Sequence, residues 1–312
     1  MNDIKVSIII PVHKTEEIGY ITRTLDGIVR TIGIPAEQYS ITLVGTTPQG
    51  TFSSKTKAKY NFLPTDALLG NAKNQGAKYA MAQYNPDVLV FMDAHMNFFD
   101  DKSANWGQVI YDFIKSHPNT VASPAISIYD KPYQRGFGVI TDVKVTNDTA
   151  DLAWRWVGSP DIRSPDSPIE VPGLCGCFMA MMPSVFKKSI FGFTPPLAID
   201  DREFSLRIWT LGVDLYALPN ITVGHRFTQG YSDFSKDRSI SWGAGYLLFS
   251  YLNMPEQYMS LVYKNGIGSS SDKLESLRMV STQYWKQMKQ ELVSKRVRTY
   301  NDYYSKYNKL LK

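Results

Sequence analysis

Short apolar runs that alternate with helical patterns are the feature that most restricts the fold of this chain. Three runs, each too short for a helix and typical of a strand buried on both faces, lie at residues 5–11, 39–44 and 87–92. Helical patterns follow at residues 15–32, 70–82 and 106–116. This order predicts an α/β fold with an open, mostly parallel sheet flanked by helices.

Polar residues that follow these strands mark the expected ligand-binding edge. In open parallel sheets, ligands bind beyond the carboxyl ends of the strands. His13 follows the first run, Thr46 follows the second, and Asp93 and His95 follow the third. The sequence lacks both the glycine pattern of dinucleotide-binding folds and a Walker phosphate loop, so neither class is supported.

Asp93 and His95 could form part of a metal site. Alternate residues of an extended segment point the same way, so the carboxylate and the imidazole converge on one spot. His225, at the end of a strand-like segment, is the candidate third ligand because the chain has only four histidines. Such a ligand set admits zinc, iron or manganese. The alternative that Asp93 caps a helix and His95 makes local hydrogen bonds stays open.

Three acids in four positions begin the helix predicted over residues 201–211: Asp200, Asp201 and Glu203. Acidic side chains are favoured there because they cap free N–H groups and face the positive end of the helix dipole. Capping explains one or two of them, and the third favours a base beside a bound sugar. Arg207 lies four residues after Glu203, at the spacing of a helical ion pair.

Glycine, tryptophan and lysine residues add candidates for binding. Gly176, between Cys175 and Cys177, would let a ligand approach the backbone, with a strand bulge as an equal alternative. Trp154 and Trp156 could stack on a sugar or an acceptor, or pack in a core or lid. The side chain of Lys73, near the start of a predicted helix, could contact a diphosphate.

The distribution of charge divides the chain. Residues 255–312 hold eleven Lys or Arg and five Asp or Glu, a balance of +6, so that the net charge of +5 leaves about −1 for residues 1–254. We therefore expect a main domain over 1–254 and a basic, aromatic-rich helical extension over 255–312. That extension could pack on the body, form a homodimer contact, or bind an anionic partner such as nucleic acid or an acidic membrane surface.

The two cysteines and the N-terminus bear on the cellular compartment. Two closely spaced cysteines are typical of reduced residues, which favours a cytoplasmic protein. The first residues do not have the pattern of a signal peptide. No apolar run reaches the roughly 18 residues needed to span a bilayer, so we expect any membrane contact to be peripheral.

Several motifs, taken in order, resemble those of a GT-A glycosyltransferase. Residues 7–13 (SIIIPVH) and 70–76 (GNAKNQG) are similar to segments of glycosyltransferase family two. Residues 93–95 (DAH) resemble the Asp-x-His metal motif of the polypeptide N-acetylgalactosaminyltransferases. Residues 200–212 (DDREFSLRIWTLG) and 223–227 (VGHRF) resemble the acid-rich helix and the Val-Gly-His metal motif of that family. The resemblance covers roughly residues 5–230.

The resemblance implies a nucleoside-diphosphate-sugar donor, with a UDP-sugar favoured, and a divalent ion, with Mn²⁺ favoured. The metal ligands would be Asp93, His95 and His225. The donor would be bound by residues from three segments, namely Pro11, Val12, His13, Asn71, Lys73, Asn74 and Asp93. The candidate substrate contacts chosen above from their residue types and positions are Trp154, Trp156, Gly176 and Glu203.

Two departures from the family pattern affect the mechanism. Retaining N-acetylgalactosaminyltransferases have Asn where this chain has Asp201, whereas inverting family-two enzymes have Asp there and use it as the base. The resemblance therefore favours inversion with Asp201 as the base and Asp200 as a contact to a sugar hydroxyl. Residues 43–47 (LVGTT) lack the acid that usually contacts the nucleobase in family two, so the identity of the base stays open.

Two other classes of function remain as alternatives. A metal-dependent hydrolase could use the same ligands, with a metal-bound water as its nucleophile and no nucleotide-sugar. A non-catalytic module could instead bind a sugar nucleotide or a nucleic acid. The order of the motifs favours the transferase, whose acceptor could be a glycan, a peptide or a modified nucleic acid.

Overall fold

A mixed sheet of ten strands is the centre of the part of the chain that the computed structural model describes. The described residues are 4–13, 16–46, 59–67, 69–145, 150–157, 167–191, 200–227, 235–264 and 269–307. The main path of the sheet follows the order β10-β12-β6-β11-β4-β1-β2-β3, with β5 paired to β12 and β7 paired to β6. Strands β8 and β9 form a separate antiparallel hairpin.

The strands and helices have the following bounds. The strands are β1 (Val6–Val12), β2 (Tyr39–Gly45), β3 (Lys59–Pro64), β4 (Val88–Met92), β5 (Met96–Phe98), β6 (Thr120–Ile128), β7 (Lys131–Gly136), β8 (Val139–Val145), β9 (Ala150–Trp156), β10 (Ile169–Glu170), β11 (Phe178–Met181) and β12 (Asp214–His225). The helices are α1 (Ile18–Thr31), the 3-10 turn η1 (Ala36–Gln38), α2 (Leu69–Tyr84), α3 (Trp106–Ser116), α4 (Pro183–Lys188), α5 (Asp200–Thr210), α6 (Ser235–Asn253), α7 (Glu256–Lys264), α8 (Ser270–Val280), α9 (Gln283–Lys295) and α10 (Tyr300–Tyr307).

The parallel core of the sheet confirms the fold class predicted from the apolar runs. Strand β1 is buried along its whole length and pairs in parallel with β2 and β4, and β2 pairs in parallel with β3. Strand β11 runs antiparallel between β4 and β6, so the sheet is mixed. Its parallel strands bring the carboxyl ends of β1 and β4 to one edge, as the sequence predicted.

Helix α1 packs one apolar face on this sheet, but two apolar residues of the helical pattern over 15–32 lie off that face. Ile21, Leu25 and Ile28 are buried, as expected from their spacing. Val29 is 38% exposed, because one residue along a helix turns by about 100° and carries the side chain off the buried face. Ile18, in the first turn, is also exposed, at 42%.

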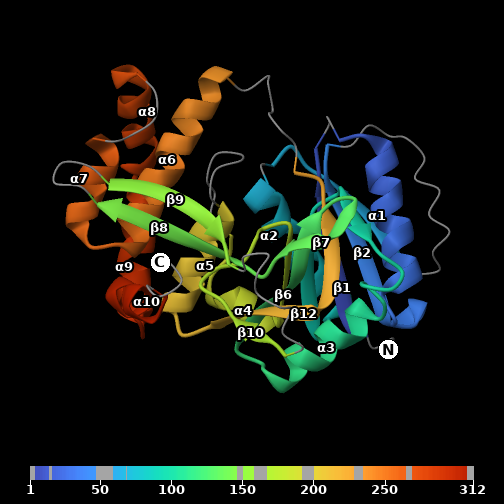
Figure 1. Ribbon diagram of the computed structural model, residues 1–312. Coiled ribbons are helices and arrows are strands. Elements are labelled where there is room, and N and C mark those ends of the chain that lie inside the picture. The colour runs from blue at the N-terminus through green and yellow to red at the C-terminus, as the bar shows by residue number, and fades with distance from the viewer. Residues whose placement is uncertain are drawn as a thin grey trace.

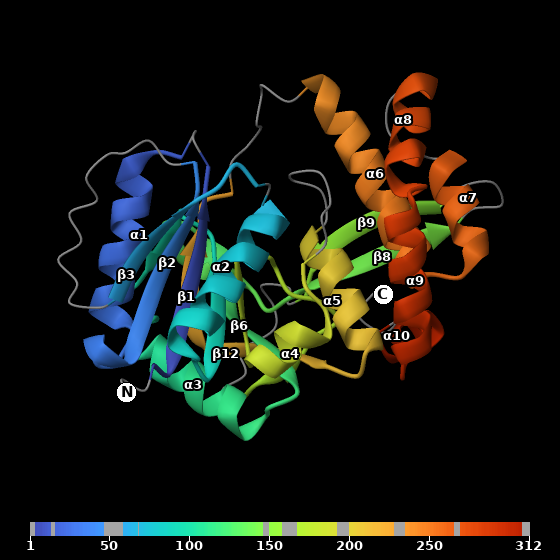
Figure 2. The ribbon, with the colours of Figure 1, turned by 180° about the vertical axis from the view of Figure 1, so that it is seen from behind.

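The C-terminal helices form a second layer beside the sheet. Figure 1 shows α6 to α10 gathered on the side of α5 away from β1 and β2, with the hairpin β8–β9 extending from the sheet towards α7. Figure 2 shows the same arrangement from behind. Where the sequence predicts a helical extension over 255–312, the described part of that segment has four helices, α7, α8, α9 and α10. None of the described helices is long and apolar enough to cross a lipid bilayer.

Ion pairs and aromatic contacts hold the C-terminal segment against the main body. Arg298 binds Asp214 at 2.7 Å, and Lys306 pairs with Glu170. Tyr303 packs edge-on against Trp209 of α5, with ring centroids 5.5 Å apart. Some basic side chains of residues 255–312 therefore bind carboxylates of the same molecule. The division into 1–254 and 255–312 stays a prediction.

Candidate metal and ligand-binding site

Pairing between β5 and β12 brings the predicted metal ligands together. Asp93 directly follows β4, and His95 directly precedes β5. Strand β5 runs antiparallel to the end of β12, with Met96 opposite His225. The backbone N–H of Arg226 also donates to the carbonyl oxygen of His95, at 3.3 Å. Residues separated by 130 positions in the sequence thus meet at the carboxyl edge of the sheet.

The side chains of Asp93, His95 and His225 form a potential metal site. One ligand atom from each lies within 4.8 Å of the others. His225 Nε2 is 3.1 Å from Asp93 Oδ2, and His95 Nε2 is 4.0 Å from the same oxygen. The buried Nδ1 of His225 has no hydrogen-bond partner among the described residues. One carboxylate and two imidazoles fit a divalent transition-metal ion.

The electrostatics of Asp93 and His225 favour protonation states that bind a metal. Burial opposes ionisation of Asp93, but the His225 hydrogen bond and the positive charge of Lys73 outweigh it and hold the pKa of Asp93 well below its usual value. Burial lowers the pKa of His225, which favours its neutral imidazole. Metal ligands must be deprotonated, so an anionic Asp93 and a neutral His225 are both suited to coordination.

Glu16 supports His95 from behind and was missed by the sequence analysis. Its Oε2 lies 3.2 Å from His95 Nδ1. Burial tends to lower the pKa of His95, but the hydrogen bond to Glu16 and the charge of Asp93 raise it overall. A carboxylate behind a ligating histidine fixes the orientation of the ring and increases its basicity. Glu16 lies at the start of the helical pattern over residues 15–32, and the local sequence gives no sign of a contact with a residue 79 positions away.

We expect Glu16→Gln to weaken Mn²⁺ binding by about tenfold, because the amide keeps the contact with His95 but removes the negative charge. Isothermal titration of Mn²⁺ into the protein measures the change. Glu17→Gln is the matched control, since the exposed side chain of Glu17 binds half-buried Arg226 at 2.9 Å and its change should leave the affinity unchanged. Equal affinities in both variants would contradict the supporting role of Glu16.

A turn around Gly176 connects the metal ligands to the acidic helix α5. The N–H of Gly176 donates to Asp201 Oδ2 at 3.0 Å, and Lys73 Nζ donates to the Gly176 carbonyl oxygen at 3.1 Å. The N–H of Asp93 donates to the carbonyl oxygen of Cys177, also at 3.0 Å. A Cβ atom on Gly176 would lie 2.8 Å from Asp201 Cβ, so glycine is required here for close packing against α5.

The predicted donor-binding residues of α2 are largely buried. Lys73 is 1% exposed, and besides its bond to Gly176 its ammonium lies 5.1 Å from the centre of the Phe191 ring. Asn74 is equally buried and exchanges two 3.0 Å hydrogen bonds with the backbone of Phe191. Asn71 is half-buried in the first turn of α2. The described polar contacts of Lys73 and Asn74 therefore join protein segments.

At the end of β1, Pro11 and Val12 are buried and His13 is exposed. Asp201 is half-buried, and it also accepts a hydrogen bond from the N–H of Arg202, at 2.8 Å. The side chains of Trp154 and Asp200 lie outside the described residues.

Glu203, a predicted substrate contact, is enclosed within the protein. Its side chain is fully buried, and both carboxylate oxygens bind Arg207 at 2.7 and 2.8 Å. The ion pair four residues apart is therefore confirmed, whereas neither oxygen of Glu203 is exposed to a ligand. Burial of this pair under the C-terminal helices could not be read from the local sequence.

Aromatic side chains line one side of the metal cluster. The ring of Phe227 packs edge-on against His225, with centroids 4.4 Å apart, and Trp156 packs edge-on against Phe227 at 5.8 Å. Trp156 is half-buried, and Phe227 is 42% exposed. The structure thus places Trp156, one of the two predicted stacking residues, next to the cluster through Phe227.

Comparisons with known proteins support a relationship to glycosyltransferases. No family model matches the chain. The probable N-acetylgalactosaminyltransferase 6 of Caenorhabditis elegans is 27% identical over 186 residues, which cover 53% of this chain and 28% of that protein. This chain therefore spans well under half of the length of that curated relative.

Two solved structures share the fold. The structure of GalNAc-T7 with UDP, GalNAc and Mn²⁺ has a TM-score of 0.74 at 15% identity, over 98% of this chain and 57% of that one. Residues 1–349 of Staphylococcus aureus TarS, in complex with UDP-GlcNAc, have a TM-score of 0.54 at 14% identity, over 99% and 81%. The chain thus has a GT-A glycosyltransferase fold with additional C-terminal helices, and its sequence is similar to those of the N-acetylgalactosaminyltransferases.

Proposed function

We propose that this protein is a metal-dependent glycosyltransferase that moves a sugar from a UDP-sugar to a hydroxyl group of an acceptor. The observation that carries the proposal is the cluster of Asp93, His95 and His225 at the carboxyl edge of the sheet. The Gly176 turn connects this cluster to Asp201. The similarity to GalNAc-T7 with UDP and Mn²⁺, and to TarS with UDP-GlcNAc, favours a uridine nucleotide and manganese.

The metal cluster serves the leaving group in this proposal. A Mn²⁺ ion held by Asp93, His95 and His225 would neutralise negative charge on the diphosphate as the bond to the sugar breaks. Lys73 adds positive charge that acts on Asp93 and also ties α2 to the Gly176 turn. Glu16 keeps the ring of His95 oriented.

We further propose that the reaction inverts the anomeric configuration, with Asp201 as the general base. Asp201 removes the proton of the acceptor hydroxyl while that oxygen bonds to the anomeric carbon and UDP leaves. Hydrogen bonds from the N–H groups of Gly176 and Arg202 fix the orientation of its carboxylate. Asp200, at the start of the same helix, contacts a sugar hydroxyl.

The acceptor site is proposed to lie along Trp156 and Phe227, because these rings lie beside His225 and Phe227 is partly exposed. Aromatic faces of this kind accept apolar faces of sugars or side chains. The candidate acceptors are a glycan, a peptide and a modified nucleic acid. An anionic partner of residues 255–312, a homodimer and a cytoplasmic location remain predictions.

Calorimetric titration of UDP with and without Mn²⁺ tests the donor site. We expect micromolar binding in the presence of Mn²⁺ and at least about tenfold weaker binding with a chelator, since the ion bridges the diphosphate and the protein. Incubation with UDP-sugars and candidate acceptors then separates transfer from hydrolysis. Failure of UDP and other nucleoside diphosphates to bind in either condition would contradict the proposal, and release of free sugar in the presence of every acceptor would favour a hydrolase.

A further inference from the structure

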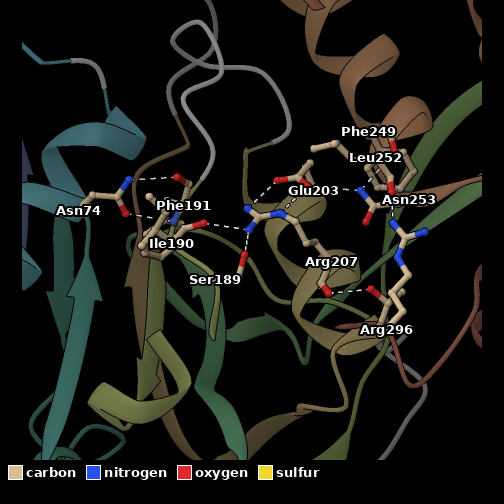
Figure 3. Close-up of polar contacts among 11 residues, drawn as sticks. Asn74, Ser189, Ile190, Phe191, Glu203, Arg207, Phe249, Leu252, Asn253 and Arg296 are labelled. Atoms are coloured by element: carbon tan, nitrogen blue, oxygen red, sulfur yellow. Dashed lines mark hydrogen bonds and ion pairs between the residues drawn. The ribbon is translucent and has the colours of Figure 1, made fainter. Parts of the chain in front are cut away.

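The Glu203–Arg207 pair is a fully buried ion pair on the helix that carries Asp201. Arg207 binds both oxygens of Glu203 in a fork-to-fork arrangement, at 2.7 and 2.8 Å. Asn253 of α6 donates to Glu203 Oε1 at 3.3 Å, which fixes the carboxylate from the opposite side. Figure 3 shows the pair between the segment at Ser189 and the end of α6. Because Glu203 is only two residues after Asp201, whatever fixes Glu203 also affects the first turn of α5.

The other end of the Arg207 guanidinium binds the chain segment that precedes α5. Its Nη1 donates to the carbonyl oxygen of Ile190, at 2.9 Å, and to the hydroxyl group of Ser189. The next residue, Phe191, is bound through both backbone polar groups by Asn74 of α2. Figure 3 shows these contacts as a continuous row from Asn74 to Glu203. Arg207 and Asn74 therefore hold residues 189–191 between α5 and α2.

A second connection between α2 and α5 passes directly beside Asp201. Lys73 binds the carbonyl group of Gly176, whose N–H binds Asp201. One turn further along α5, Ser205 Oγ accepts a hydrogen bond from the N–H of Leu174, at 3.1 Å. Two segments therefore fix the position of Asp201 relative to the metal cluster: the turn around Gly176, and residues 189–191, which Arg207 binds.

The chemistry of the pair favours a role in orientation over a role in stability alone. Burying two charges carries a desolvation cost, and apolar side chains of similar size often stabilise a protein equally well. The planar guanidinium, by contrast, fixes direction, since it serves the Glu203 carboxylate and the Ile190 carbonyl group at once. The ammonium group of a lysine has no such planar fork, so it could not bind the carboxylate and the carbonyl group in the same way.

We propose that Arg207 is a positioning residue for Asp201. It binds Glu203 on α5 and, on the segment that precedes α5, the Ser189 hydroxyl group and the Ile190 carbonyl group. These contacts hold the first turn of α5 in place relative to the metal cluster. The consequence for turnover rests on the proposed function, in which Asp201 is the base. The geometric consequence, a fixed hydrogen bond between Gly176 and Asp201, does not depend on that function.

Arg207→Lys tests the proposal because it keeps the buried charge and removes the fork. We expect kcat to fall by about tenfold or more, because small displacements of a catalytic group are costly, while the dissociation constant of UDP with Mn²⁺ stays within about twofold. Amide hydrogen exchange of Gly176 and Phe191 should become faster. Arg298→Lys is the matched control: Arg298 also binds a carboxylate, that of Asp214, and this variant should change neither kcat nor the two amides.

Amide hydrogen exchange tests the positioning role of Arg207, and sugar transfer tests the proposed function, so the two proposals can fail separately. Wild-type exchange rates at Gly176 and Phe191 in the Arg207→Lys variant would overturn the positioning role, whether or not the protein transfers sugar. Faster exchange at these amides in a protein that transfers no sugar would support the positioning role and reject the proposed function. If Arg207→Lys does not fold, Ser189→Ala takes its place, because it removes one contact of Arg207 and leaves Glu203 paired. Faster exchange at Phe191 then supports the proposal, and an unchanged rate overturns it.

Discussion

His225→Ala is expected to lower the affinity for Mn²⁺ by about 100-fold or more and to remove metal-dependent UDP binding, since even supporting contacts of a ligand contribute tenfold or more. His225 is one of three clustered ligand residues, and its Nε2 lies 3.1 Å from Asp93. The two that remain, Asp93 and His95, would leave an ion with an incomplete protein ligand set. Titration of Mn²⁺, followed by titration of UDP in the presence of Mn²⁺, measures both effects.

His117→Ala is the control for this experiment. His117 is exposed at the end of α3, where its ring stacks on Phe113 with centroids 4.4 Å apart. Its removal should leave Mn²⁺ and UDP binding unchanged. If His225→Ala folds with a wild-type melting temperature and binds Mn²⁺ as tightly as His117→Ala does, the assignment of His225 as a ligand is wrong.

The metal cluster could be predicted because its ligand residues occur in short sequence motifs at the ends of strands. Asp93 and His95 follow a strand at alternate positions, and His225 ends another strand, so strand ends and residue types were sufficient. The local sequence did not show what brings them together. Strand β5 has only three residues, and its pairing with β12 depends on a segment more than 120 positions away. Glu16 was missed for the same reason, since its partner His95 is distant in the sequence.

Residues of the predicted donor and substrate sites were harder to assign, because burial depends on which segment covers a side chain. Lys73 and Asn74 begin α2 with the composition of a ligand-binding helix, but residues 176 and 191 cover them. Glu203 was predicted to contact substrate, although Arg207 and the C-terminal helices enclose it. In each case the segment that covers the side chain is distant in the sequence, so the residues around that side chain do not indicate its burial.

The same distinction applies to the fold. Strands β1, β2 and β4 are buried on both faces and therefore have continuous apolar sequences, which made them predictable. Strand β7 is largely exposed at the edge of the sheet, and its polar sequence gave no such signal. Helix α10 buries Tyr300, Tyr303 and Tyr307, and two of these rings pack on Trp209, so packing on the body, one of the alternatives predicted for the basic, aromatic-rich extension, is confirmed for this helix.

Asp201→Asn is expected to lower kcat by about 1,000-fold, within the range attributed to a positioned general base, while UDP binding with Mn²⁺ changes by less than about twofold. Asparagine has nearly the same size, and its Oδ1 can still accept the hydrogen bond from Gly176, so the turn around Gly176 should persist. The variant loses the ability to take a proton from the acceptor hydroxyl and, because the amide nitrogen cannot accept, the hydrogen bond from the N–H of Arg202. Steady-state kinetics and UDP calorimetry together separate the two effects.

The stereochemistry of the product tests the role of Asp201 independently of the rate. An enzyme that uses Asp201 as a base for direct attack yields a product of inverted anomeric configuration, which proton NMR of the wild-type product detects. Asp214→Asn is the control and should keep wild-type kcat, because Asp214 is a half-buried aspartate at the start of β12 that pairs with Arg298. Retained configuration, or an Asp201→Asn variant as active as this control, would assign Asp201 to holding the Gly176 turn alone. The geometry favours the base, because both N–H contacts fix the Asp201 carboxylate at the start of α5 and leave it half-buried instead of enclosed like Glu203.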